Sequence, residues 1–453
     1  MAATPIQVPR RPAIVWSVVD EHLSEASFLW VQWERLLDAT DHSFAEIVED
    51  DEPRLLAHLE GLAIGGQPVA HKRLLPLLEG GEEFRTVCAA AHALLEAPDR
   101  DWIGVILERL QEDDEALRQG LLRALELSGC PDISTALLQQ LPEASPALQT
   151  GILAVLRHRH THPGDALSRM DGATSNVSAA AVRAATFAPL SLVSEFVRRG
   201  LTSDDASVRL AALETGLRRG LPIAWQACRA AREANGPEVR LGLLALSVGG
   251  TARDLKHVVA ALDKPALQTE ALWALGFSGK LAAADALFSI LQAEASSLAA
   301  ESFSAITGLP LHPPFVNDTG EDTETGSTDA SIEAKVGDPT AAIECILAPP
   351  SIGAGHVDSG KVEQWWSHAR GRFDAESRYL YGHPCSVQSL LSALESAPMR
   401  RRAAMAFEIA IRSQGHCLIE PRLWAATQHR QAQELRKVRP RNLVVAFEAL
   451  QAS

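Results

Sequence analysis

A ten-residue phrase that the chain repeats with variations constrains the fold more than any other feature. Residues 147–156 read ALQTGILAVL and residues 266–275 read ALQTEALWAL, so the two copies open on the same four residues. Apolar side chains then recur at helical spacing, as Leu148, Ile152 and Leu156 do in the first copy. This spacing places them on one face of an amphipathic helix.

Looser copies of the phrase follow one another at a fairly regular interval. The interval is roughly 30 residues, which is typical of stacked structural repeats rather than of a single globule. We expect an arginine at the third position of a copy to brace the turn of an adjacent repeat. The third residues of the copies are Arg85, Arg118, Gln149, Arg183, Arg209, Arg240, Gln268 and Ala299.

Each repeat between about 81 and 308 is predicted to hold two helices, of which the phrase forms the second. Apolar residues such as Trp102 and Ile106 supply the first helix, and breakers such as Gly236 and Pro237 separate the units. Neither helix can bury its apolar face alone, so neighbours must stack in a continuous curved array. The sequence therefore predicts an all-α fold, an α-solenoid of helix pairs whose open concave trough is the working surface.

The ends of this array differ in composition from its middle. Trp16, Trp30 and Trp33 are bulky anchors for a helix that covers an exposed end of the stack. After Gly308 the periodicity stops, and the acidic, Gly- and Ser-rich stretch that follows cannot bury enough apolar surface to order itself. The predicted divisions are an N-terminal helical cap at 1–80, a repeat solenoid at 81–310, a flexible acidic loop or linker at 311–360 and a C-terminal helical region at 361–453.

Composition and charge argue against several classes of partner. The 453 residues carry a net charge of −15, which disfavours nucleic acid because phosphate binding needs a basic face. No apolar run is long enough to cross a bilayer, and residues 1–11 lack the apolar stretch of a signal peptide. The six cysteines form no CxxC pair, so reduced thiols in a cytoplasmic protein are expected.

The C-terminal region has the opposite charge to the rest of the chain. Residues 361–453 hold fourteen Lys or Arg and eight Asp or Glu, so their net +6 leaves about −21 for the first 360 residues. Arg400, Arg401 and Arg402 are expected to form a solvated face or to pair with the acidic body.

Aromatic and guanidinium side chains also gather in this region, a mixture typical of binding hot spots and of base-stacking sites. The alternative is that one tryptophan belongs to the core and that the arginines brace the acidic repeats. The candidate partner-binding residues are Trp365, Trp366, Arg370, Arg372, Arg378, Tyr379 and Tyr381.

One stretch matches a phosphate-binding motif only in part. Residues 355–361 fit GxxxxGK, but Val362 stands where a phosphate loop needs Ser or Thr for magnesium, and no strand is predicted before it. The pattern favours a loop in which Asp358 or Ser359 caps the helix that carries Trp365.

The histidine cluster is the other local pattern of interest. Only His158 and His162 have the i, i+4 spacing of metal ligands on a helix, and Pro163 ends the helix there, so a solvent-exposed helix end is favoured over a metal site. The chain contains no GxSxG, HExxH or paired-carboxylate motif. We therefore predict no catalytic residue, no metal and no cofactor.

The repeat phrases over about 81–310 resemble HEAT and HEAT-like repeats, including the short class shared with bilin-lyase subunits. Residues 51–62 (DEPRLLAHLEGL) and 299–309 (AAESFSAITGL) resemble motifs of an uncharacterised bacterial family, and the segment from Trp365 to Gly382 is similar to its C-terminal signature. Members of that family tend to be encoded among type VI secretion genes, near spike proteins and effector adaptors. The resemblance implies a role beside that apparatus and no particular catalytic residue.

These observations favour a non-enzymatic scaffold that holds a protein partner on the concave face. The resemblance implies that the partner is a secretion effector, its adaptor or a spike component. One alternative is an immunity protein that neutralises a toxin. A second is a HEAT-like enzyme of the lyase or base-excision kind, and a lyase would need an acidic or histidine residue inside the groove beside a cofactor pocket.

Overall fold

A computed structural model describes residues 14–98, 101–170, 174–231, 237–294, 296–317, 346–347 and 356–451. This part of the chain is all-α, as the sequence predicts, and its only strands form two antiparallel two-residue pairs. None of the described helices combines the length and apolar character that crossing a bilayer requires.

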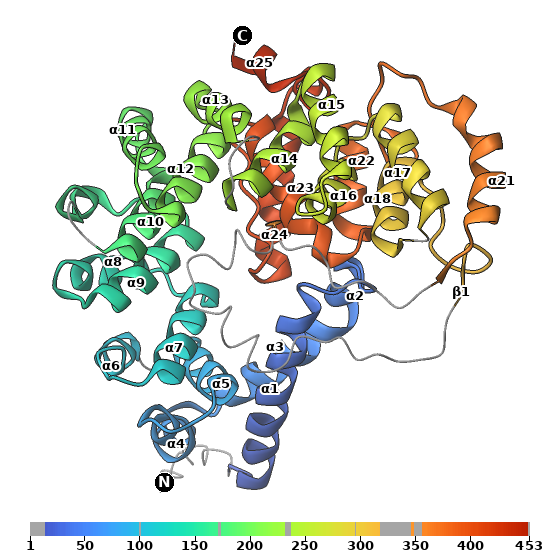
Figure 1. Ribbon diagram of the computed structural model, residues 1–453. Coiled ribbons are helices and arrows are strands. Elements are labelled where there is room, and N and C mark those ends of the chain that lie inside the picture. The colour runs from blue at the N-terminus through green and yellow to red at the C-terminus, as the bar shows by residue number, and fades with distance from the viewer. Residues whose placement is uncertain are drawn as a thin grey trace, which may run out of the picture.

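The helices follow one another along an arc that runs from the blue N-terminus through green to yellow in Figure 1. The N-terminal helices are α1 (Trp16–Leu36), α2 (Phe44–Glu46), α3 (Glu52–Ile64) and α4 (Gly66–Val69). Eight helices, the inner row, then pack each on the next: α5 (Phe84–Leu95), α7 (Glu115–Leu127), α9 (Pro146–His158), α10 (Ser175–Ala184), α12 (Ala206–Arg218), α14 (Pro237–Gly249), α16 (Gln268–Leu275) and α18 (Ser297–Thr307).

Six further helices, the outer row, pack against the inner row: α6 (Ile103–Arg109), α8 (Ile133–Gln140), α11 (Leu190–Leu201), α13 (Pro222–Ala231), α15 (Ala252–Ala260) and α17 (Leu281–Ala293). The C-terminal elements are α21 (Ser359–Ala369), α22 (Val387–Ser396), α23 (Met399–Arg412), α24 (Ala425–Gln433) and α25 (Phe447–Gln451). The strand pairs are β1 (Val316–Asn317) with β2 (His356–Val357), and β3 (Tyr379–Leu380) with β4 (His383–Pro384).

Short 3₁₀ or π segments connect these helices. They are η1 (Ile47–Asp51), η2 (Ala70–Leu74), η3 (Leu75–Leu78), η4 (Leu141–Glu143), η5 (Gly164–Met170), η6 (Ala185–Phe187), η7 (Ala261–Asp263), η8 (Arg370–Arg372), η9 (Glu434–Lys437) and η10 (Pro440–Leu443).

Helix α9 illustrates why the repeated phrase forms a buried helix. The hydroxyl of Ser145 accepts a hydrogen bond from the backbone nitrogen of Leu148, and Pro146 occupies the first turn, so the helix begins there. The stripe predicted from the sequence is confirmed, because Leu148, Ile152 and Leu156 are all buried. Gly151 lets α9 approach α7 closely: a Cβ at this position would lie 2.3 Å from Cδ1 of Leu122.

Three of the arginines at the third position of the phrase brace adjacent repeats, as expected, and the first is Arg183 of α10, whose Nε lies 3.1 Å from Oε2 of Glu214 on α12. Nε of Arg209 lies 2.6 Å from Oε1 of Glu238 on the next inner helix, and its Nη1 donates to the carbonyl of Ser203. Arg240 pairs in the same way with Glu270, at 3.1 Å. The equivalent Arg118 instead pairs with Glu115 inside its own helix.

The expected open trough is wrong for much of the inner row, because the C-terminal region lies within the arc. Helices α23 and α24, in orange and red, lie between the blue N-terminal helices and the green and yellow inner helices (Figure 1). Nη2 of Arg412 donates to the carbonyl of Val248 on α14, at 2.7 Å. Nη1 of Arg401 lies 3.2 Å from Oε1 of Glu301 on α18. The basic region pairs with the acidic body instead of leaving a groove open to solvent.

Arg400, Arg401 and Arg402 therefore do not form the solvated face offered as one expectation. Arg401 and Arg402 are 1% and 2% exposed. Arg400 is half-buried, and its Nε lies 3.1 Å from Oε1 of Glu301. The other expectation, pairing with the acidic body, is confirmed for Arg400 and Arg401.

Most of the predicted acidic linker lies outside the described residues. Helix α18 ends at Gly308, which adopts a left-handed conformation with φ of 76°. Ile346 and Leu347 are described and buried, and Nε1 of Trp273 donates to the carbonyl of Ile346 at 3.2 Å. This short piece therefore packs inside the arc.

Candidate functional site

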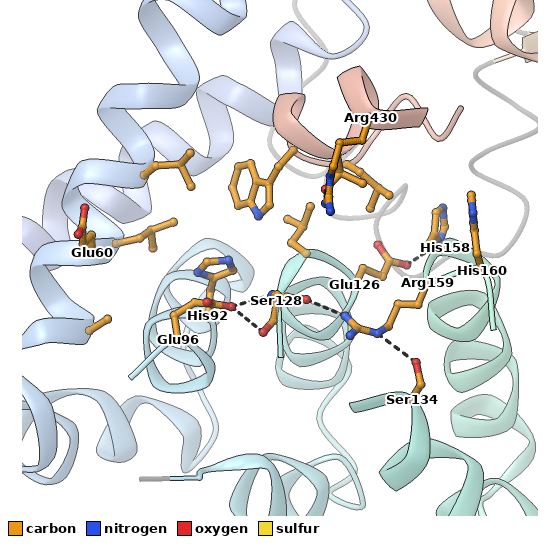
Figure 2. A pocket seen from close by; sticks show the side chains of 18 of the residues that line it. Glu60, His92, Glu96, Glu126, Ser128, Ser134, His158, Arg159, His160 and Arg430 are labelled. Atoms are coloured by element: carbon orange, nitrogen blue, oxygen red, sulfur yellow. Dashed lines mark hydrogen bonds and ion pairs between the residues drawn. The ribbon is translucent and has the colours of Figure 1, made fainter. Parts of the chain in front are cut away.

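A cavity of about 1000 Å³ remains between the N-terminal half of the inner row and the C-terminal region. Residues of α3, α5, α7, α9 and α24 line the cavity, so it lies between α24 and the helices of the N-terminal half (Figure 2). Its volume is at the upper end of the roughly 300–1,000 Å³ found for small-molecule sites. Apolar side chains on its wall are Leu56, Leu59, Ala63, Ile64, Leu127, Leu423 and Trp424.

His92 of α5 lies on the cavity wall with no hydrogen-bond partner among the described residues. Its side chain is buried, and both ring nitrogens are unpaired. The rings of Trp30 and Trp424 lie edge-on to it, at centroid distances of 5.9 and 5.5 Å. Burial lowers the pKa of His92 to about 4, against a smaller opposite effect of Glu96. At neutral pH the ring is therefore uncharged, with one donor and one acceptor nitrogen.

Glu126 and His158 form a half-buried pair on the opposite wall (Figure 2). Nδ1 of His158 lies 3.1 Å from Oε1 of Glu126, and Nη1 of Arg123 lies 2.8 Å from Oε2. Burial alone would raise the pKa of Glu126, but His158 and Arg123 lower it to about 2. The carboxylate is therefore ionised and held by both partners.

Arg159 shapes the floor of the cavity through its backbone contacts. Its guanidinium donates to the carbonyls of Leu125, Ser128 and Cys130 at distances of 2.6 to 3.1 Å. These carbonyls end α7 and begin the following loop, so Arg159 ties two consecutive repeats together. Its positive charge has no carboxylate within salt-bridge distance among the described residues.

Charged side chains of both signs line the cavity. Glu60 and Glu96 lie on one side and Arg430 and Arg159 on the other (Figure 2). In the described part of the chain, Glu60 makes no hydrogen bond or ion pair. Oε1 of Glu96 accepts from the hydroxyl of Ser128 and the backbone nitrogen of Gly129, both neutral donors.

Arg430 has only a neutral partner within the described chain. Its Nη2 donates to the hydroxyl of Thr427 at 3.0 Å, and its side chain is exposed. The charged lining of the cavity is therefore mixed, because Glu126 and Glu434 line the same side as Arg159 and Arg430, and Glu96 interacts with Arg159.

The histidine cluster marked in the sequence contributes two residues to this wall. Helix α9 ends at His158, so the predicted helix end is confirmed. The predicted exposure to solvent is wrong, because His158, His160 and His162 are all half-buried. His160 stacks on Phe187 at a centroid distance of 4.6 Å, and burial lowers its pKa. His158 and His160 therefore line the cavity, which the sequence pattern alone does not predict.

Two of the titratable groups of the cavity, Glu126 and His92, are poorly matched to proton transfer at neutral pH. A general acid or base works best with a pKa near the operating pH, whereas the pKa of Glu126 is about 2 and that of His92 about 4. In the part of the chain that the structure describes, no group of three or more His, Cys, Asp or Glu side chains is placed to hold a metal ion.

The residues predicted from the sequence to bind a partner lie elsewhere, against α17 and α18. Trp366 packs on Phe303 of α18 at a centroid distance of 5.0 Å and is buried, while Trp365 stacks on Trp366 and is half-buried. Tyr379 is buried, and its hydroxyl accepts from the backbone nitrogen of Asp374.

The arginines of this group contact the preceding repeats. Nη2 of Arg378 donates to the carbonyl of Phe277 at 2.7 Å, and the guanidinium also pairs with Glu408. Exposed Arg370 forms two hydrogen bonds to Asp285, of 2.9 and 2.8 Å. These contacts correspond to the bracing alternative.

Two members of the group remain to be placed. Arg372 is exposed, and its guanidinium lies 5.8 Å from the ring centroid of Trp365. Half-buried Tyr381 donates its backbone N–H to the carbonyl of Ala305, at 2.7 Å. A partner-binding role for the group stays a prediction.

The partial phosphate motif has the structural role favoured from the sequence. Asp358 caps α21, since its Oδ1 accepts from the backbone nitrogen of Lys361 at 3.0 Å. Gly355 lies outside the described residues.

Sequence reasoning missed His92, Glu96 and Arg430 as cavity residues. His92 and Glu96 lie at the end of α5, more than 300 residues before Arg430 of α24. None of the three belongs to a recognisable local motif. Comparison with known proteins adds no further assignment: no protein-family model matches the chain, and no curated protein is significantly similar to it.

Proposed function

We propose that this chain is a non-enzymatic scaffold, an α-solenoid of HEAT-like helix pairs that holds a protein partner. The observation that supports the proposal most is the open cavity between the inner row and α24, which both charged and apolar side chains line. It is what remains of the concave face once the C-terminal region has packed into the arc. A protein-binding surface requires charged and apolar side chains more than it requires catalytic groups with shifted pKa values. Both kinds of side chain line the cavity.

The sequence resemblance supplies the biological setting of the proposal. We propose a cytoplasmic accessory role, as adaptor or chaperone, beside a bacterial type VI secretion apparatus. The partner would be an effector, its adaptor or a spike component, with no nucleic acid and no membrane involved. An immunity protein that neutralises a toxin would use the same kind of surface and differs only in the outcome of binding.

Recovery of the partner from the native host tests this function. The chain, tagged at its own locus and expressed at its native level, is cross-linked in cells and purified, and co-purifying proteins are identified by mass spectrometry. We expect a component encoded with the secretion apparatus, which must then co-elute with the purified chain in gel filtration. Recovery of no specific protein would contradict the scaffold function.

Deletion of the gene separates the adaptor role from the immunity role. An adaptor predicts loss of secretion of the partner, with unchanged survival of the deletion strain among its kin. An immunity protein predicts that kin carrying the matching toxin kill the deletion strain.

One observation favours the lyase-type alternative enough to keep it as a second candidate. His92 and Glu96 lie beside a cavity large enough for a cofactor, which is the arrangement that such an enzyme would need. The test is the absorbance spectrum of the chain purified from its host. A bound chromophore, or one acquired from a host extract, would support the enzyme, whereas no absorbance beyond that of the protein would count against it.

A further inference from the structure

Two histidines on neighbouring helices bring their ring nitrogens together outside the cavity. Nδ1 of His22 on α1 lies 3.1 Å from Nδ1 of His58 on α3, although the residues are 36 positions apart in the chain. The ring planes are 68° apart, with 5.1 Å between the centroids. Within the described residues, neither ring has another hydrogen-bond or ion-pair partner. Neither histidine lines the cavity.

The distance between these nitrogens is that of two ligands on one metal ion. Zinc–nitrogen bonds to histidine are about 2.0–2.1 Å long, so two nitrogens on one ion lie about 2.9 Å apart at a right angle and about 3.4 Å apart at the tetrahedral angle. The observed 3.1 Å is between these values. The alternative is an N–H···N hydrogen bond, which requires different tautomers in the two rings, whereas a metal ion binds both rings with Nδ1 unprotonated.

The two helices hold the nitrogens in this arrangement. Helix α1 packs on α3, and Leu59 and Leu62 beside the pair are buried. The ring of His22 lies against Gly61, where a Cβ would be 2.9 Å from Nε2 of His22, so the absence of a side chain there makes room for the ring. Both histidines are half-buried, so solvent reaches the pair. The ligand atoms are therefore positioned by the fold and remain accessible to an ion.

The chemistry of the pair selects the kind of ion. Imidazole suits Zn²⁺, Cu²⁺ and Ni²⁺, whereas Mg²⁺ and Ca²⁺ prefer oxygen ligands. In the described part of the chain, no group of three or more His, Cys, Asp or Glu side chains is placed around one ion, so water must fill the other coordination positions. The net charge of −15 favours the approach of a cation.

We propose that His22 and His58 bind one divalent transition-metal ion through their Nδ1 atoms, with water in the remaining positions. The ion joins α1 to α3 and stabilises the N-terminal end of the arc. This site goes beyond the proposed scaffold function and does not depend on it.

Metal binding to the full chain tests the proposal. The chain is purified without a histidine tag, freed of metal with a chelator and titrated with Zn²⁺ or Mg²⁺ by calorimetry at pH 7.5. We expect Zn²⁺ to bind at this site and Mg²⁺ not to bind there. One equivalent of Cu²⁺, which imidazole binds more tightly, should give an electron paramagnetic resonance spectrum with coupling to two imidazole nitrogens.

Substitutions at the pair must weaken this binding. His22→Asn and His58→Asn each remove one ligand, so each should weaken Zn²⁺ binding at least about tenfold, the lower limit found when even a group that supports a ligand is lost. Gly61→Ala keeps both histidines and should also weaken binding, because the new methyl group displaces the ring of His22. The control His368→Asn removes an exposed histidine on α21 and should change nothing.

Circular dichroism of each variant checks that it is folded, and the copper spectrum of the wild type needs no variant. Zinc binding that is equally tight in the wild type, His22→Asn and His58→Asn would overturn the proposal. So would a wild-type chain that binds neither Zn²⁺ nor Cu²⁺, or a copper spectrum without coupling to two nitrogens. The pair would then be joined by the hydrogen bond alone.

Discussion

Oε1 of Glu52 lies 2.8 Å from the backbone nitrogen of Ala425, a residue 373 positions further along the chain. Ala425 is the first residue of α24, and the residue before it, Trp424, provides no side-chain cap. Glu52 therefore takes the place of the missing cap, and its carboxyl group is also held by Nε1 of Trp33, at 3.2 Å. One buried carboxyl group thus joins the start of α3 to the helix that forms one wall of the cavity.

The first prediction concerns the pH dependence that this contact causes. Burial raises the pKa of Glu52 from 4.5 to about 7, despite the hydrogen bonds from Ala425 and Trp33. The folded protein therefore binds this proton more tightly than the unfolded chain. The resulting stabilisation is present below pH 4.5 and is lost as the pH rises to 7, by up to roughly 3 kcal/mol.

Glu52→Gln cannot titrate, which isolates this contribution. The free energy of unfolding of the wild type minus that of Glu52→Gln, measured by urea denaturation, should fall steadily between pH 5 and pH 8. A difference that is constant with pH would show that the carboxyl group titrates normally.

The second prediction concerns the buried ion cluster around Glu214 of α12. Nε of Arg183 and Nε of Arg218 each lie 3.1 Å from this carboxylate, and Nη2 of Arg157 lies 3.4 Å away. All four side chains are at most 5% exposed. Glu214→Ala would leave three buried guanidinium groups without this counter-ion, so we expect a loss of about 3–5 kcal/mol in the free energy of unfolding.

Glu115→Ala is the matched control because it breaks the exposed pair with Arg118. Its expected cost is below about 1 kcal/mol. Urea denaturation of both variants checks the pair of values, and equal losses would mean that the cluster around Glu214 is no stronger than a surface pair.

The third prediction tests how the C-terminus is docked. A Cβ at Gly249 of α14 would lie 2.3 Å from ring atoms of Phe447, which begins α25. Gly249→Ala should therefore displace Phe447, cost about 1–3 kcal/mol and expose the C-terminus to limited proteolysis. Gly104 of α6 has open space around it, so Gly104→Ala should stabilise the chain by about 0.5–1 kcal/mol. Unchanged proteolysis of Gly249→Ala would contradict the docking of α25.

The fourth prediction concerns the effect of the buried His92 ring on stability. His92→Phe keeps the ring contacts with Trp30 and Trp424 but removes two unpaired buried nitrogens, so we expect it to stabilise the chain by about 1 kcal/mol at pH 7. The gain should grow as the pH falls from 6.5 to 4, because the folded wild type resists protonation there. Lower stability at pH 7, or a gain that does not grow as the pH falls, would contradict this expectation.

The helix pairs could be predicted from the sequence because the apolar residues of the repeated phrase recur at a spacing within a single helix. The burial of Leu148, Ile152 and Leu156 follows from a stripe that any amphipathic helix carries. The bracing by Arg183, Arg209 and Arg240 was foreseeable for a similar reason, since the same position recurs along the repeats and, in these three, faces a glutamate of the next inner helix.

The filling of the arc was not foreseeable from such patterns. It depends on pairs such as Arg422 with Glu34, whose Nη2 and Oε2 lie 2.5 Å apart although the residues are 388 positions apart. The opposite charges of the two parts of the chain indicate that these parts attract each other. They do not determine which residue pairs with which. His92 and Glu96 are neighbours by their i, i+4 spacing, but Arg430 joins them in one cavity only because of these long-range pairs, which no spacing in the sequence predicts.

Hydrogen–deuterium exchange on the complex of the full chain with its native partner tests the central claim most directly. If the partner occupies the cavity, amide exchange should slow in α24 (Ala425–Gln433) and in the second half of α3 (Glu52–Ile64), which form its walls. Exchange in α21 (Ser359–Ala369), which carries Trp365 and Trp366, should not change. Slower exchange confined to α21, with none at the cavity, would contradict the claim.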